Sequence, residues 1–334
     1  MVWLKFAACV VIILFAGTRL ARYGDAIAEK TGLGRIWIGL VLLAAITSMP
    51  ELVTGVSAAA LVKLPDLALG NLFGSCLFNL LILAVLDVLY RPAPILSQAS
   101  PRHMLSAGMG ILLIAVAAGS ILTGGRFSGL AAGWVGAPSI IIASLYLAGM
   151  WWVFRSERGR QPQPVEAASL QYKELSKKTV YLRFTLAAAA IIGAGIWLAF
   201  IGEELAATYN WHASFVGSLF LAITTSMPEL VVTIAALRLG AIDMAVADIL
   251  GSNMFNIAII APVDASYKPG SLLASVSPAH LTTAAVTIIM SLLVILGLRF
   301  RQRRKPFFIG WYTPVLIGLY IFGAYALFQG IVPG

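Results

Sequence analysis

The chain has 334 residues, of which 60% are hydrophobic and only 11% are charged, and it carries a net charge of +9. Several apolar runs reach about 20 residues, the length at which a helix crosses a bilayer. A soluble domain needs more polar surface than this composition provides. The sequence therefore predicts an all-α polytopic membrane protein.

Ten runs are predicted to span the membrane, at 3–18, 35–62, 66–88, 103–123, 128–154, 180–201, 213–237, 241–262, 278–299 and 307–330. The first has no clear cleavage site, so we expect a retained helix and not a removed signal peptide. Ten spans put both termini on one side. If that side is outside, 19 of the 23 Lys and Arg residues lie inside, as the positive-inside rule requires.

This charge distribution favours membrane topology and anionic lipid as the explanation of the basic runs, and not nucleic acid. We expect an integral protein of the cell (inner) membrane with its termini outside. The one long polar segment, 155–179, contains Pro162 and Pro164 and is expected to be a cytoplasmic linker. It separates a first five-helix repeat at 1–154 from a second five-helix repeat at 180–334.

The two halves share a sequence repeat. The stretch "ITSMPELVTGVSAAALVKLPDLALGNLFGSCLFN" (46–79) aligns with "TTSMPELVVTIAALRLGAIDMAVADILGSNMFN" (224–256), with one residue inserted in the first copy. Matching Glu, Pro and Asn at fixed spacing is not expected by chance from hydrophobic helices. Because five is an odd number, the second copy must cross the membrane in the opposite sense. An inverted repeat of this kind is typical of transporters with a site near the midplane.

Each copy carries a glutamate inside an apolar span, and an intramembrane carboxylate is functional by default. Pro50 cannot donate a backbone hydrogen bond and is expected to distort its helix. Thr47 and Ser48 precede Glu51 by four and three residues, so these oxygens can share one face. Oxygen ligands of this type suit hard cations. The second copy repeats them as Thr225, Ser226, Pro228 and Glu229.

A second motif adds a hydroxyl and an amide four residues apart, at Ser75 and Asn79 and again at Ser252 and Asn256. A two-fold axis would bring Glu51 and Glu229 together. Two adjacent carboxylates repel each other unless a divalent ion, two monovalent ions or protons lie between them.

The remaining polar residues are given other roles. Asp66 and Asp243 are expected to cap helices, Asp87 to lie at the interface, and the histidines are assigned none. Asp248, which stands where the first copy has Asn71, is left with three interpretations: a hydrated cytoplasmic vestibule, a cap or an interhelical hydrogen bond. Cys9 and Cys76 are expected to be free, packed thiols.

At the motifs "TSMPE", "GSCLFN" and "GSNMFN" the sequence resembles the cation/calcium exchanger superfamily, which includes the sodium/calcium exchangers. The resemblance covers the whole chain and implies ten transmembrane helices in two inverted five-helix repeats. It also implies a set of cation ligands, which are Glu51, Glu229, Thr47, Thr225, Ser48, Ser226, Ser75, Ser252, Asn79 and Asn256.

The sequence departs from the family pattern at two places. Ile46 and Thr224 stand where glycine is common, and both Asn79 and Asn256 are amides where known exchangers pair Asn with Asp. The centre therefore has two carboxylates, enough to neutralise one Ca²⁺ or two Na⁺. This leaves both Na⁺ and H⁺ open as the coupled ion.

We expect a secondary antiporter that exchanges Ca²⁺ for Na⁺ by alternating access. The alternative is an exchanger of Ca²⁺, or of another divalent cation, for H⁺, and a cation channel is less favoured. The sequence has no HExxH motif, His–Cys metal cluster or Walker-type loop. We therefore expect neither an enzyme nor a cofactor, and no use of ATP or nucleic acid. The expected partners are Ca²⁺, Na⁺ or H⁺, and membrane lipid.

Overall fold

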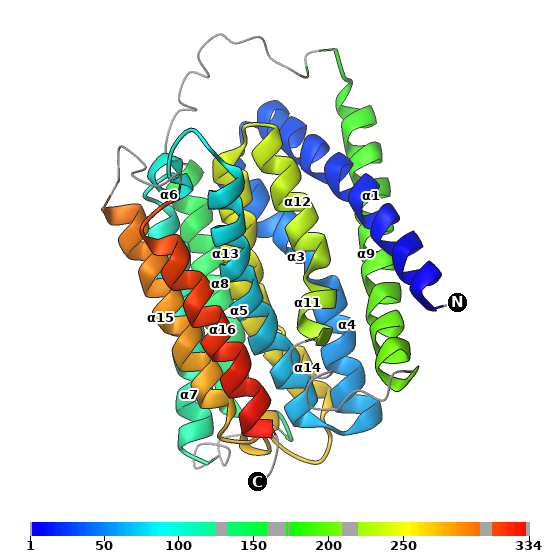
Figure 1. Cartoon of the computed structure of the whole chain (residues 1–334), viewed down its shortest axis with the longest axis vertical. Coiled ribbons are helices and arrows are strands. Elements are labelled where there is room, and N and C mark those ends of the chain that lie inside the picture. The colour runs from blue at the N-terminus through cyan, green and yellow to red at the C-terminus, as the bar shows by residue number, and fades with distance from the viewer. Residues whose placement is uncertain are drawn as a thin grey trace.

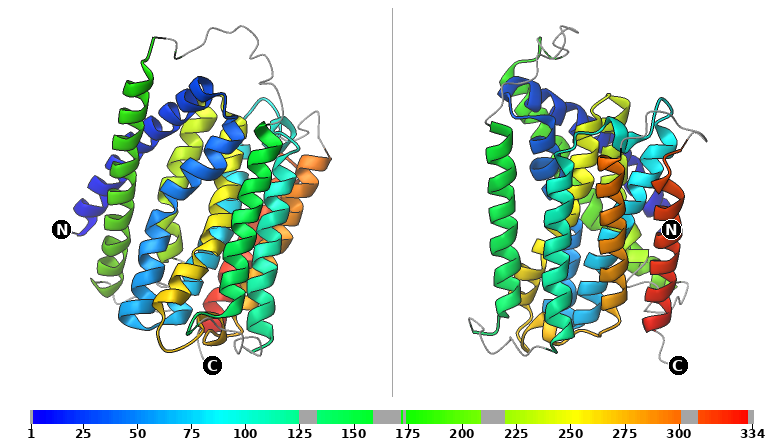
Figure 2. Two further views of the ribbon diagram at one scale, coloured as in Figure 1. Left: turned by 180° about the vertical axis from the view of Figure 1, so that it is seen from behind. Right: turned by 90° about the vertical axis from the view of Figure 1, so that its left-hand side faces the viewer.

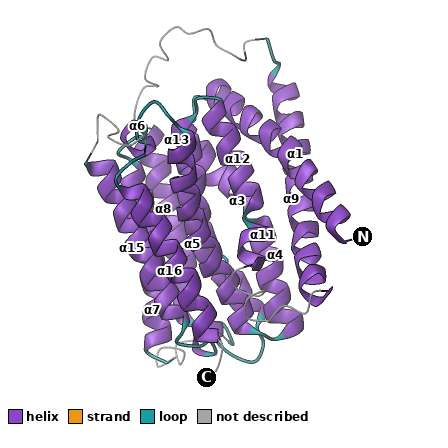
Figure 3. Ribbon diagram, viewed as in Figure 1, coloured by secondary structure: helices purple, strands orange, loops and turns teal. Residues whose placement is uncertain are grey.

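The computed structural model describes residues 2–124, 133–158, 172, 174–208, 220–300 and 309–331. Throughout these residues the regular structure is helical, as Figure 3 shows. The helices form an elongated bundle whose described connections gather at its two ends (Figure 1). Eight helical stretches of the described chain are long and apolar enough to cross a membrane. The predicted all-α membrane fold is confirmed.

The helices of the first half follow one another with short connections, and the second span is assembled from five consecutive pieces. Two of those pieces, η1 and η2, are π-helical, a distortion that is frequent at functional sites. The elements are α1 (Val2–Thr31), α2 (Arg35–Trp37), η1 (Ile38–Leu43), α3 (Ala44–Thr47), α4 (Met49–Ser57), η2 (Ala58–Val62), α5 (Pro65–Leu89), α6 (Ile95–Gln98), α7 (His103–Leu122) and α8 (Ala137–Arg158).

The second half has the same order of long and broken helices. Its elements are α9 (Lys177–Thr208), α11 (Leu221–Thr225), α12 (Met227–Arg238), α13 (Ile242–Ala258), α14 (Ile260–Ser266), η5 (Leu272–Ala274), α15 (His280–Arg299) and α16 (Tyr312–Ile331). The chain descends through α3 and α4 in Figure 1 but ascends through α11 and α12, and it ascends through α5 but descends through α13. Corresponding helices therefore run in opposite directions, which is the arrangement of an inverted repeat.

Several predicted boundaries need correction. The first helix was predicted to end near Thr18 but continues to Thr31, because its polar second half packs inside the protein with Asp25 only 1% exposed. The fifth predicted span, 128–154, has its described helix at Ala137–Arg158. Residues 128–132, 213–219 and 307–308 of the predicted spans lie outside the described part of the chain, as does most of the predicted linker. The number ten stays a prediction.

Two helices, α5 and α13, form the centre of the bundle. Of the most apolar 18 residues of each span, 72% are buried in α5 and 89% in the span Ile242–Ser266, which contains α13, against 33% in α1. Figure 2 shows the bundle from two further directions, with α13 (yellow) beside α8 (green) in the left view. Large apolar side chains on the outside, such as Leu4, Leu61 and Leu147, are exposed as expected for a surface that faces lipid. Polar side chains on α5 and α13 consequently lie deep within the protein.

Gly251 allows α13 to approach the second span closely. A Cβ atom at this position would collide with the carbonyl oxygen of Leu40 and lie 2.8 Å from the Leu40 Cα atom. Only glycine permits this backbone separation, as expected for a small residue at a helix crossing in a membrane. The position of Gly251 in the "GS" motif brings Ser252 next to the broken helix.

Candidate functional site

Each glutamate motif contains a one-residue interruption of its helix. Ser48 separates α3 from α4 with φ −89° and ψ 12°, and Ser226 separates α11 from α12 with φ −86° and ψ 9°. Pro50 and Pro228 then lie in the first turn of the new helix, where a missing N–H is tolerated. The predicted distortion is thus present in both copies, in the same conformation, but it is confined to a single residue.

The two motifs are joined by a crossed pair of hydrogen bonds. The hydroxyl of Ser48 donates to Oε1 of Glu229 at 2.7 Å, and the hydroxyl of Ser226 donates to Oε1 of Glu51 at 3.0 Å. All four side chains are fully buried. Because each serine serves the glutamate of the other repeat, the two carboxylates are held in one polar centre between the halves.

The predicted ligands include buried oxygen atoms without a hydrogen-bond donor. Among the described residues, Oε2 of Glu51, Oε2 of Glu229 and the amide oxygens of Asn79 and Asn256 have no partner, although all are buried. A buried polar atom left unpaired costs about 1–3 kcal/mol, and more when it is charged. Such atoms call for an explanation, and a bound cation supplies one because it needs several oxygen ligands at once.

The remaining predicted ligands are hydroxyl groups. Thr225 lies within hydrogen-bond distance of Asn71 Oδ1, at 3.3 Å, and of Ser75 Oγ, at 3.4 Å. Thr47 donates to the carbonyl oxygen of Leu43 at 3.1 Å, which leaves its lone pairs available. Ser252 Oγ has no partner in the described structure. All ten residues predicted as ligands are 0% exposed, and hydrogen bonds join six of them in three pairs: Ser48 with Glu229, Ser226 with Glu51, and Ser75 with Thr225.

The two motif prolines meet at a glycine of a third helix. A Cβ atom added to Gly195 on α9 would collide with Cγ of Pro50 and lie 3.5 Å from Cγ of Pro228. The interruptions of both broken helices are therefore close together, and α9 packs directly against them. A side chain at residue 195 would displace at least one proline ring.

All side chains of the predicted site offer oxygen atoms as ligands. The site consists of two carboxylates, several hydroxyls and two amides, and the described residues contain no group of three or more His, Cys, Asp or Glu side chains that could hold a metal. Carboxylate, hydroxyl and amide oxygens are the ligands preferred by hard cations such as Ca²⁺. The arrangement suits reversible binding of a hard cation deep in the membrane.

Comparison with known proteins agrees with this geometry. The model of the family described as "Sodium/calcium exchanger protein" matches residues 1–155 and 179–331. The chain belongs to this family. The resemblance seen in the motifs is confirmed, and the protein is a member of a family of membrane exchangers and not of a family defined by an enzyme reaction.

Two relatives and one solved structure illustrate the relationship. The inner membrane protein YrbG of Escherichia coli (strain K12) is 29% identical over 268 residues, which are 78% of this chain and 78% of that protein. The putative antiporter CaxA of Alkalimonas amylolytica is 25% identical over 269 residues, 78% of this chain and 79% of that protein. A structure of the sodium-calcium exchanger NCX_Mj superposes with a TM-score of 0.72 at 20% identity, covering 95% of each chain. The last match shows a shared fold.

This exchanger-family chain also contains acids whose hydrogen-bond partners the sequence did not lead us to expect. Asp66 and Asp243 were predicted to cap their own helices, but no side chain caps α5 or α13. Asp66 instead accepts hydrogen bonds from the backbone of Ser277 at 2.6 Å and pairs with His280 at 3.0 Å. Asp243 makes the equivalent contacts with Ser100 and His103. The repeated spacing "SPRH" and "SPAH" was the overlooked signal.

Asp87, which was predicted to lie at the interface near the end of its span, is fully buried within the protein. Asp87 accepts hydrogen bonds from the backbone of Ile95 and Gly310, and Asp264 in the other half accepts them from Leu272 and Gly136. These acids fix the connections beyond the core helices. The repeat therefore continues past Asn79 and Asn256, through "DVLYRPAPIL" and "DASYKPGSLL".

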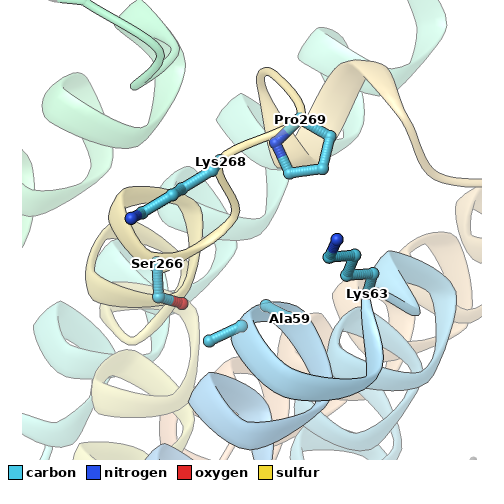
Figure 4. Close-up of a pocket in the computed structure, with 6 residues that line it drawn as sticks. Ala59, Lys63, Ser266, Lys268 and Pro269 are labelled. Carbon is cyan, nitrogen blue, oxygen red and sulfur yellow. The ribbon is translucent and has the colours of Figure 1, made fainter.

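A cavity at one end of the bundle is separate from this centre. It measures about 530 Å³ and is lined by Ala59, Ala60, Lys63, Ser266, Lys268 and Pro269. Figure 4 shows it between the end of η2 and the turn after α14, with both lysines beside it. None of the predicted ligands lines it. A small hollow of about 10 Å³, in contrast, lies against Pro50 and Thr54 at the face of α9, beside the first motif.

Proposed function

We propose that the protein is a secondary antiporter that exchanges Ca²⁺ for Na⁺ across the membrane by alternating access. The observation that carries this proposal is the crossed pair Ser48–Glu229 and Ser226–Glu51. Each hydrogen bond holds one carboxylate oxygen and leaves the other, Oε2, without a partner among the described residues. Two such oxygens facing a common centre supply the two negative charges that one Ca²⁺ requires.

The proposed ligand set follows from the same centre. The two glutamates neutralise the ion, and hydroxyl and amide oxygens complete a coordination shell of about six to eight ligands. The proposed ligands are Glu51, Glu229, Thr47, Thr225, Ser48, Ser226, Ser75, Ser252, Asn79 and Asn256. Two Na⁺ ions carry the same charge as one Ca²⁺. Binding of either one Ca²⁺ or two Na⁺ would therefore neutralise the two glutamate carboxylates.

The inverted halves supply the basis for alternating access. We assign 1–154 to the first five-helix repeat, 155–179 to a cytoplasmic linker and 180–334 to the second five-helix repeat. The ion site lies where the halves meet, so a rocking motion of one half against the other would open it to each side in turn. The described basic residues support an orientation with the linker in the cytoplasm and the termini outside the cell (inner) membrane.

Exchange of Ca²⁺ for H⁺ is the second candidate, and one observation favours it. Both Asn79 and Asn256 are amides, so the centre holds two carboxylates and not three. Two protons neutralise two carboxylates without any need for further oxygen ligands. We infer a transporter that uses the ion gradient alone, with no cofactor, ATP or catalytic reaction.

Flux measurements in proteoliposomes test these proposals. The purified full-length protein is reconstituted with Ca²⁺ inside, and an inward gradient of either Na⁺ or H⁺ is imposed in separate experiments. Calcium efflux that saturates and requires Na⁺ on the opposite side supports the main proposal. Efflux driven only by the H⁺ gradient supports the second candidate. Efflux that needs no counter-ion would indicate a channel and contradict both.

A further inference from the structure

The two repeats differ at one buried position beside the ion site. Asn71 on α5 and Asp248 on α13 occupy equivalent places, 177 residues apart, as do Ser75 and Ser252. Asn71 is satisfied, because it lies 3.5 Å from the hydroxyl of Thr54 and 3.3 Å from that of Thr225. Asp248 is 0% exposed, and neither of its carboxylate oxygens has a hydrogen-bond partner in the described structure.

A second difference between the repeats concerns one of the two hydroxyl groups that contact Asn71. Thr54 lies three residues after Glu51, and the residue three after Glu229 is Val232. The second repeat has therefore lost a hydroxyl at the place where it gained a carboxylate. A structural role for Asp248 would have required the opposite change, because a buried carboxylate needs more donors than an amide does. The predicted cap or interhelical hydrogen bond is absent, and complete burial argues against an open vestibule.

No positive side chain of the described residues neutralises Asp248. The elements that pack against α13 are η1, α7, α5, α12, α2, α3, α8 and α14, and η1 and α3 carry no charge. Arg35 on α2 is held by Asp25 at 2.5 Å, and His103 on α7 is held by Asp243 at 2.9 Å. The remaining charged groups of these elements are Asp66 and Asp87 on α5, Glu229 and Arg238 on α12, Arg155, Glu157 and Arg158 on α8, and Asp264 on α14.

Asp248 belongs to the same polar stripe as the proposed ion site. Ser252 and Asn256 follow it at intervals of four residues on α13, about 6 and 12 Å along the helix axis. Ser252 Oγ also lacks a partner among the described residues. The helix that carries Glu229, α12, packs against α13, which carries Asp248. In the orientation proposed above, this position is on the cytoplasmic side of the glutamate pair.

We propose that Asp248, with Ser252 beside it, is a binding site for one monovalent cation next to the central site. An uncompensated carboxylate in so dry a place is costly, and a single positive charge removes that cost. Together with Glu51 and Glu229 it gives three carboxylates. One Ca²⁺ and one monovalent cation, or three monovalent cations, would then leave the loaded protein neutral. The inference rests on the proposed exchange for its role in transport, but the site itself can be tested by binding alone.

The test uses a chain in which the central charges have been removed. In Glu51→Gln/Glu229→Gln the glutamates are neutral and Asp248 remains. Binding of Na⁺ is measured by calorimetry at fixed alkaline pH. Proton uptake is measured in a Na⁺-free choline medium. The triple variant, which adds Asp248→Asn, is measured in parallel. Because Asp248→Asn alone lacks a hydroxyl partner, a further variant adds Val232→Thr and so recreates the Asn71–Thr54 pair of the first repeat.

We expect the Gln/Gln protein to bind one monovalent cation per chain, and both variants with Asp248→Asn to bind none. A signal in the sodium arm identifies the ion as Na⁺, and a signal only in the proton arm identifies it as H⁺. Absence of binding to the Gln/Gln protein, or equal binding to the Asp248→Asn variants, would overturn the proposal. Calcium exchange by the wild-type protein is assayed separately. Its absence would refute the proposed function without changing the number of cations bound at Asp248.

Discussion

Ser48 and Glu229 lie 181 residues apart in the chain and 2.7 Å apart in the structure, joined by a hydrogen bond from the serine hydroxyl to the carboxylate. Ser226 and Glu51 form the equivalent bond at 3.0 Å. Each repeat therefore supplies the hydrogen-bond donor for the acid of the other. A relative movement of the two halves would change both bonds at once, which couples the shape of the ion site to the arrangement of the repeats.

We predict that Ser48→Ala and Ser226→Ala weaken calcium binding by similar amounts. Each removes a donor to a buried carboxylate, a contribution of about 1.5–3 kcal/mol for a hydrogen bond to a charged group, or roughly tenfold or more in affinity. Calorimetric titration of purified protein measures the effect. Ser144→Ala is the control, because that exposed hydroxyl contacts only its own helix at Ile140. A large effect from one serine and none from the other would contradict the two-fold arrangement.

Gly195→Ala is expected to destabilise the protein by about 1–3 kcal/mol, because the new methyl group collides with the ring of Pro50. The displaced proline should also lower calcium affinity. Thermal unfolding and calcium titration measure the two effects. Gly193→Ala on the same helix is the matched control. Nothing lies within 4 Å of its Cβ position, and alanine favours the helix by up to about 1 kcal/mol. Equal behaviour of the two variants would argue against the close packing of α9 on the motifs.

The sequence predicted part of this site, but not the contact between the two repeats. The spacing of Thr47, Ser48 and Glu51 predicted a shared face and a cation site, since a buried carboxylate in a membrane span is costly without a function. It could not predict that Ser48 would serve Glu229. Helical spacing identifies neighbours within one element, whereas this contact depends on how two broken helices cross.

The acids near the helix ends show a second feature that could not be predicted from hydropathy. Asp87 was predicted to lie at the interface because it stands close to the end of an apolar run. It is buried because backbone N–H groups at Ile95 and Gly310 come to it from two separate connections. Hydropathy records the cost of burying an acid but not the donors that compensate for it. Comparison of "DVLYRPAPIL" with "DASYKPGSLL" would have shown that Asp87 and Asp264 occupy equivalent positions in the two repeats.

Asn256→Asp is expected to alter ion coupling more than stability. The added charge gives the centre a third carboxylate, which favours an additional monovalent cation and should strengthen the dependence of calcium flux on Na⁺. Flux is measured in proteoliposomes over a range of Na⁺ concentrations and pH values. Asn253→Asp, one turn away on the same helix, is the comparison, since Asn253 donates to the backbone of Cys76 and is not a proposed ligand. Unchanged sodium and pH dependence in Asn256→Asp would exclude a central role for this residue.

Calcium affinity is expected to fall as the pH falls. Calcium requires both glutamates in the charged form, whereas the calcium-free centre takes up protons to relieve the repulsion between the carboxylates. Binding must therefore release protons, and each proton released changes the affinity by up to about tenfold per pH unit. Calorimetry in buffers of different ionisation enthalpy counts the protons. No release between mildly acidic and neutral pH would mean that both acids are already charged, and would disfavour coupling to H⁺.

The central claim is that Ca²⁺ binds between Glu51 and Glu229, and direct calcium binding to single Gln variants tests it. Glu51→Gln and Glu229→Gln keep the size of the side chain and remove one charge from a buried pair. Loss of one buried charge costs about 2–5 kcal/mol, so each should weaken binding by roughly 30-fold or more. Glu204→Gln, which removes an exposed partner of Lys5, is the control and should bind like wild type. Wild-type calcium affinity in either Glu51→Gln or Glu229→Gln would contradict the account.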